Sequence, residues 1–183
     1  NGAQLWNVPM KTDYGRHVAA PLTHKNMVLA GSHQVGLQGI KISNGGDDLN
    51  AEVVWKNVEA QPNISHGVRV ADHYYGVADP AKLVCVEIST GKIAWRNEDL
   101  SFPDPKRAMA TFIVMGKNIL SLSSGGELCL FAAPPKGLKE LGRTQGCRIN
   151  WFLPAHVHRQ IYLRHGIQKK GGRLLSLHLT NPT

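Results

Sequence analysis

One pattern recurs along the chain and limits its fold more than any other feature: short apolar strands joined by tight turns, with a closing strand that ends in tryptophan. Trp6, Trp55 and Trp95 mark such strands and lie 49 and 40 residues apart. Hairpins of the form apolar, turn, apolar recur with them, and their matching positions are 47, 44 and 42 residues apart (Val28, Tyr75, Ile119 and Ile161). A period of about 40–50 residues with short alternating strands is typical of the blades of a β-propeller.

Helical patterns are nearly absent, because Gly or Pro interrupts most long windows. We therefore predict an all-β chain that forms a single propeller domain over residues 1–183, with about four four-stranded blades. The expected blades are 18–56, 66–96, 109–143 and 151–178.

The last expected blade has only three strands, whereas residues 3–8 form an orphan strand at the start of the chain. We predict that these residues pair with the last blade and close the ring, which would remove an exposed sheet edge. The alternative is that the chain is the C-terminal half of a larger ring of about seven or eight blades. The chain begins at Asn1 without Met and without a charged and then apolar leader, which we interpret as a processed product or a fragment.

The segment L-V-C-V-E-I-S-T-G-K-I-A-W at 83–95 resembles the repeat of the pyrroloquinoline-quinone-like (quinoprotein alcohol dehydrogenase-like) β-propeller family. In that family a T-G-K or T-G-E turn and a closing tryptophan make a docking contact between neighbouring blades. Thr90, Gly91 and Trp95 match this pattern fully, whereas Trp55 and Trp6 match only its closing position. Other segments resemble the C-terminal blades of bacterial secreted quinoprotein-like propellers, which implies a periplasmic or secreted location. The same repeat serves dehydrogenases and outer-membrane assembly scaffolds, so the resemblance implies a fold rather than a function.

The dehydrogenases of that family enclose their quinone in an eight-bladed ring and bind Ca²⁺ through carboxylates and Asn, often beside adjacent cysteines. Here the three cysteines are isolated and two lie in apolar runs, so we expect buried free thiols (Cys85, Cys129 and Cys147). Asp47 and Asp48 lie in a polar N-G-G-D-D turn rather than in a shaped loop of oxygen ligands. We therefore expect no bound quinone and no other cofactor, with zinc or copper as the alternative.

The first strand of each blade lies closest to the axis of a propeller. His17, His66, Arg107 and Trp151 fall at or near this strand at nearly equivalent places in the four blades. Loops at the same blade position cluster in space, so these side chains and Arg16 are predicted to form a ligand pocket at one mouth of the channel. The alternative is a polar, water-filled channel.

Histidine is unusually frequent, with nine residues in the chain. His156 and His158 form an H-x-H pair, which places both rings on one face of a strand, and His165 follows seven residues later. These three are the candidate ligands for Zn²⁺ or Cu²⁺. Alignment with the other blades places His158 in a hairpin turn, so surface histidines without a metal are the alternative.

The net charge is +8, from 21 basic and 13 acidic residues, but we do not expect nucleic-acid binding because no stacking aromatics interleave with a basic stripe. No apolar run is long enough for a membrane span. The predicted function is a binding or scaffold module for a protein or a small ligand, without chemistry of its own. The alternative is an enzyme, either a metal-dependent oxidase or a hydrolase, that uses the histidines. The length also permits two four-blade halves to meet as a dimer.

Overall fold

The structure is a computed structural model of the whole chain. It describes residues 2–46, 49–78, 80–97, 109–133, 135–149, 152–165 and 172–179. Within these ranges the regular elements are β-strands and one 3₁₀ helix, η1 (Val58–Ala60). The prediction of an all-β chain is confirmed.

The strands form four antiparallel sheets, and each sheet is one blade in which neighbouring strands follow one another along the chain. Blade 1 contains β1 (Leu22–His24), β2 (Met27–Ser32), β3 (Gly36–Asn44) and β4 (Leu49–Asn57). Blade 2 contains β5 (Val68–Val70), β6 (His73–Ala78), β7 (Lys82–Glu87) and β8 (Ile93–Asn97). Blade 3 contains β9 (Ala110–Met115), β10 (Asn118–Ser123), β11 (Glu127–Ala132) and β12 (Lys139–Gln145). Blade 4 contains β13 (Ala155–Val157), β14 (Gln160–His165) and β15 (Arg173–His178).

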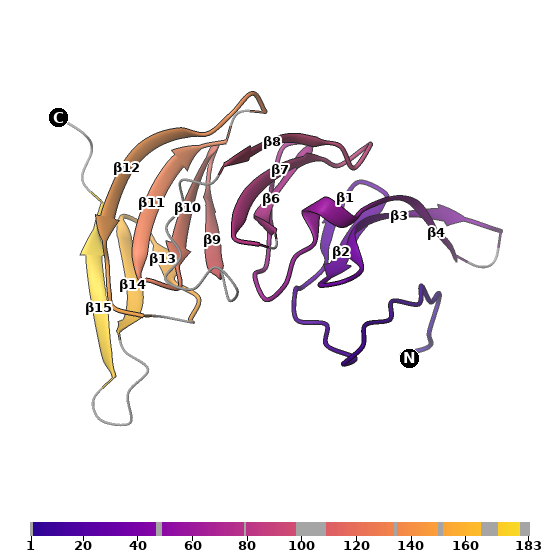
Figure 1. Cartoon of the computed structure of the whole chain (residues 1–183), viewed down its shortest axis with the longest axis horizontal. Helices are drawn as coiled ribbons and strands as arrows, with labels where there is room; N and C mark the ends of the chain where they lie inside the picture. Colours follow the sequence, from indigo (N-terminus) through magenta and orange to yellow (C-terminus); the bar gives the residue numbers. More distant parts are fainter. Residues whose placement is uncertain are drawn as a thin grey trace.

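The four blades stand side by side in an arc, with blade 1 at one end and blade 4 at the other (Figure 1). The predicted closure of blade 4 by residues 3–8 is not formed in this structure, because residues 2–12 adopt no strand. They run alongside blade 1, at the opposite end of the arc from β15 (Figure 1). Blade 4 therefore has three strands among the residues described.

A two-residue turn joins the first and second strands of every blade, and its first residue has a positive φ in all four (Lys25 53°, Ala71 50°, Gly116 64° and His158 55°). Such turns match the right-handed twist of the strands they join. The second strands begin at Met27, His73, Asn118 and Gln160, which are 46, 45 and 42 residues apart. The residue of blade 2 that corresponds to Val28 is therefore Tyr74, one position before the Tyr75 that the sequence pattern suggests.

The hydrophobic core lies between the blades in three clusters. The first joins blades 1 and 2 around Leu37 and Val86, the second joins blades 2 and 3 around Leu83 and Phe131, and the third joins blades 3 and 4 around Leu163. Blades 2 and 3 therefore bury both faces of their sheets, one against each neighbour, and no blade has a core of its own.

The docking contact implied by the resemblance is formed between blades 1 and 2. The Nε1 of Trp55 donates a hydrogen bond to the carbonyl of Ile88 at 2.9 Å, and Nδ2 of Asn57 donates to the carbonyl of Gly91 at 2.6 Å. Gly91 has a φ of +72°, and a Cβ there would lie 2.4 Å from the Trp55 ring. Glycine at this turn is therefore required both by its backbone conformation and by the tryptophan packed on it.

Between blades 2 and 3, a tyrosine donates a hydrogen bond to the equivalent carbonyl. The hydroxyl of buried Tyr75 donates to the carbonyl of Ala133 at 2.7 Å, and the Trp95 ring packs on Tyr75 with a centroid distance of 6.0 Å. Ala133 directly follows the third strand of its blade, as Ile88 does. The same carbonyl of the repeat is thus bound by an aromatic donor of the preceding blade in both cases.

Candidate functional site

Residues 12–18 form a loop that is fixed to blade 1 at its start, here called the 12–18 loop. Gly15 N–H donates to the Thr12 carbonyl at 3.1 Å, and Arg16 N–H donates to the Thr12 hydroxyl at 3.0 Å. Gly15 has a φ of +59°, which closes the turn without a side-chain clash. Thr12 is buried, and Asp13 exchanges two hydrogen bonds with the Gln34 side chain.

Arg16 ties this loop to two other parts of the molecule. Its carbonyl accepts a hydrogen bond from the buried Ser32 hydroxyl at 2.8 Å. Its guanidinium Nη2 donates to Oδ1 of Asn63, in the connection between blades 1 and 2, at 2.9 Å. Further along that connection, Nδ1 of His66 accepts a hydrogen bond from Ala20 N–H at 2.8 Å.

The structure thus brings Arg16 and His66, two of the predicted channel-mouth residues, to the place where the N-terminal segment meets the connection between blades 1 and 2. His17 lies on the same loop with its side chain exposed. The other two predicted residues, Arg107 and Trp151, lie outside the described residues. Their part in a common pocket stays a prediction.

Sequence reasoning missed Tyr14, which is the most exposed aromatic residue described. It lies at the tip of the 12–18 loop with 85% of its surface exposed, and Val18, the last residue of the loop, is 41% exposed. The T-D-Y-G turn at 12–15 was the available signal, because Asp followed by Gly two positions later is typical of a tight turn that displays the residue between them. Tyr14, His17 and Val18 are therefore presented to solvent by a loop whose backbone is fixed.

Ser32 and His33 lie beneath this loop, with 3.3 Å between Ser32 Oγ and His33 Nδ1. Ser32 donates its single hydroxyl proton to the Arg16 carbonyl. The proton in the contact between Ser32 Oγ and His33 Nδ1 is therefore assigned to His33 Nδ1, which donates to the hydroxyl oxygen. His33 Nε2 is then a buried acceptor, and it has no hydrogen-bond partner among the residues that the structure describes. Ser32 is fully buried and gives its proton to a carbonyl, so this pair is not an activated serine.

The three predicted metal ligands are not gathered at one point. His156 lies in β13 opposite Ile161, whereas His158 occupies the turn that follows, where the chain reverses. His165 is the last residue of β14, four positions beyond Ile161, which corresponds to about 13 Å along a strand. Among the described residues no group of three or more His, Cys, Asp or Glu side chains is arranged to hold a metal ion. Asp47 and Asp48 lie outside the described residues.

The three cysteines are buried, as predicted (Cys85, Cys129 and Cys147). Burial raises the pKa of Cys85 to about 11 and that of Cys129 to about 11. Both thiols are protonated at neutral pH, so neither is a nucleophile or a ready metal ligand.

Four antiparallel sheets that pack face to face around an arc, each built as a meander, define this chain as a β-propeller structure. A family model described as outer membrane protein assembly factor BamB matches residues 1–97 and 47–132. These matches cover more than half of the sequence, so the chain belongs to that family. None of the curated proteins matches the sequence.

Two solved structures show the same fold. BamB from Moraxella catarrhalis is 16% identical with a TM-score of 0.57, and the match covers 80% of this chain and 40% of that chain. The computationally designed Ika4 protein is 12% identical with a TM-score of 0.61, and the match covers 98% of this chain and all of that one. This chain therefore spans about 40% of the length of the BamB chain that it matches. In the described part of the chain, no helix has the length and apolar character to cross a membrane.

Proposed function

We propose that the chain is a periplasmic binding and scaffold module for a protein partner, without a bound quinone and without chemistry of its own. The membership in a family described as an outer membrane protein assembly factor supports a partner among the proteins that assemble the outer membrane. The positive net charge favours a partner with an acidic surface.

The observation that carries this proposal is the fixed 12–18 loop. Its backbone is held by hydrogen bonds within the loop and by the Ser32 hydroxyl, and the Arg16 side chain is held by Asn63, while Tyr14 and Val18 remain exposed. A loop that is already ordered loses little conformational freedom when a partner binds, so more of the contact energy appears as affinity. Tyrosine is also among the residues that contribute most at protein interfaces.

The propeller frame supports the same role. Each blade is joined to the next by a buried apolar cluster. Hydrogen bonds from Trp55 and Tyr75 add to the first two of these interfaces. Such a frame presents its loops in constant positions, which suits a scaffold.

The test is a direct binding measurement between the purified chain and purified outer-membrane assembly proteins by biolayer interferometry. Tyr14→Ala and His17→Ala are expected to weaken binding by about tenfold, the effect of removing an interface residue worth about 1.4 kcal/mol. The control is Leu174→Ala, which removes a side chain of similar exposure (74%) from blade 4. Equal affinity for all variants, or loss with the control alone, would show that the 12–18 loop is not the binding surface.

A further inference from the structure

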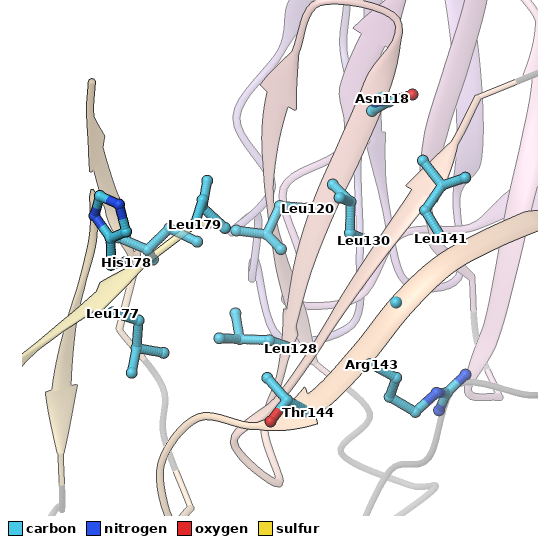
Figure 2. Close-up of a pocket in the computed structure, with 12 residues that line it drawn as sticks. Asn118, Leu120, Leu128, Leu130, Leu141, Arg143, Thr144, Leu177, His178 and Leu179 are labelled. Carbon is cyan, nitrogen blue, oxygen red and sulfur yellow. The ribbon is translucent and has the colours of Figure 1, made fainter. Parts of the chain in front are cut away.

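An apolar groove of about 620 Å³ lies between blades 3 and 4, here called the β12–β15 groove. Figure 2 shows leucines that extend toward one another from its two sides. Leu128, Leu130 and Leu141 come from β11 and β12, whereas Leu177 and Leu179 come from β15 and the residue that follows it. The groove continues the buried cluster that already joins these two blades.

The repeat itself indicates what belongs in this groove. Between blades 1 and 2, the fourth strand of the following blade, β8, fills the corresponding place, and Ile93 packs into the cluster with Trp55. Residues along β8 are alternately half-buried, whereas every residue of β12 is exposed. In the described part of the chain, β15 has no strand on its outer edge. The β12–β15 groove therefore has the shape and the free backbone edge for a fourth strand of blade 4.

We propose that residues 3–8 of a second copy of this chain bind in the β12–β15 groove as that fourth strand. The sequence A-Q-L-W-N-V carries its tryptophan where β4 and β8 carry Trp55 and Trp95. In the present structure this segment forms no strand, and Leu5 is 65% exposed and Trp6 37% exposed. Burial of both side chains in a blade would remove exposed apolar surface from water.

The reach of the chain favours a second copy over the same molecule. Thr12 is buried at blade 1, so only the four residue-to-residue links from Val8 to Thr12 can span the distance to the groove. Fully extended, these links reach at most about 14 Å. Packed sheets lie about 10 Å apart, so blades 1 and 4 of one arc are separated by three sheet-to-sheet spacings, or about 30 Å. When blade 1 of a neighbouring copy packs against blade 4, the two blades are only one spacing of about 10 Å apart. The segment reaches that groove without leaving its own attachment.

A reciprocal exchange of residues 3–8 between two copies gives a closed dimer. A two-fold axis places blade 1 of each copy beside blade 4 of the other, so both grooves receive a strand and neither sheet edge stays open. The expected product is a dimer of twice 20.0 kDa.

The first test is the molar mass of the purified chain by size-exclusion chromatography with light scattering. Gly142 lines the groove, and a Cβ there would meet nothing within 4 Å, so Gly142→Trp fills the groove without disturbing its own blade. This variant is expected to be monomeric with an unchanged circular dichroism spectrum. Glu52→Trp is the control, since it adds the same side chain to an exposed position of β4, and it is expected to remain a dimer. A monomeric parent chain would overturn the proposal, as would a dimer that Gly142→Trp leaves intact.

The second test identifies the strand by cross-linking. One copy carries Leu5→Cys and the other carries Ser176→Cys on β15, and the native cysteines are buried and do not compete. Oxidation of the mixture is expected to give a covalent dimer that contains one of each. A chain with both substitutions that forms its disulfide within a single molecule would show closure by its own N-terminal segment and would overturn the exchange. No disulfide in either sample would show that residues 3–8 do not bind β15.

Discussion

Gly91→Ala tests whether the contact between Trp55 and the third-to-fourth turn of the next blade stabilises the propeller. The substitution has two separate costs. Gly91 has a φ of +72°, where a side chain costs about 1–2 kcal/mol. The added Cβ would also lie 2.4 Å from Cε3 and 2.5 Å from Cδ2 of Trp55, so the ring must move. Overpacking of this kind costs about 1–3 kcal/mol more.

Gly116→Ala is a matched control that separates these two costs. Gly116 has a similar φ of +64°, but a Cβ there would meet nothing within 4 Å. Gly116→Ala therefore carries only the backbone cost. The difference in free energy of unfolding between the two variants then gives the cost of the clash with Trp55. We expect Gly91→Ala to lower the free energy of unfolding by about 2 kcal/mol more than Gly116→Ala does. Its melting temperature should then lie about 4–8 °C below that of Gly116→Ala.

The assay is urea unfolding followed by tryptophan fluorescence and circular dichroism, with melting temperatures from calorimetry. In the background of Trp55→Ala, the ring that opposes the new methyl group is gone. Gly91→Ala should then cost only about as much as Gly116→Ala does. Equal losses for the two alanine variants in the parent chain would refute the reasoning, because the clash with Trp55 would then have no energetic consequence.

Three further predictions concern buried, titrating and metal-binding groups. Tyr75→Phe removes the buried hydroxyl bond to the Ala133 carbonyl and should lower the free energy of unfolding by about 1–3 kcal/mol, whereas Tyr162→Phe near the surface should change it little. Hydrogen bonds from the Ser89 and Thr90 hydroxyls lower the pKa of Glu87, so its contribution to stability is present above the usual glutamate pKa and is lost as the pH falls below about 4. Glu87→Gln should therefore be less stable than the parent chain at pH 7, and the difference in urea titrations should shrink as the pH falls below the usual glutamate pKa. Elemental analysis should find no stoichiometric zinc or copper, and a metal that is lost when His156 and His158 are both replaced by Ala would instead favour the enzyme alternative.

Much of the fold was predictable because the repeat shows itself in side-chain types. The strands are short and rich in apolar residues, and tight turns separate them, so the spacing of turns and tryptophans marks the strands. The position of Tyr75 was misaligned by one residue, since a two-residue turn has no fixed sequence in this chain: Lys25, Ala71, Gly116 and His158 all occupy its positive-φ position.

The candidate site was less predictable. Equivalent blade positions suggested Arg16 and His66, and both lie where the N-terminal segment meets the connection between blades 1 and 2. The contacts that fix them come from Asn63 and from the Ala20 backbone, and no pattern in the sequence marks these partners. The histidines 156, 158 and 165 looked like a ligand set because they are close in sequence, but a hairpin turn and the length of β14 separate them.

The sequence by itself determined the all-β character, the blade period and the glycine and tryptophan that dock neighbouring blades, because these depend on local backbone conformation and on which face of a strand is apolar. Only the tertiary structure decided which surfaces remain open. Residues 3–8 have the pattern of a strand, yet they form one only if a partner edge lies within reach, and β15 lies at the opposite end of the arc from them (Figure 1). Strand pairing is non-local, so its outcome depends on the distance between the two edges and not on the sequence of either one alone.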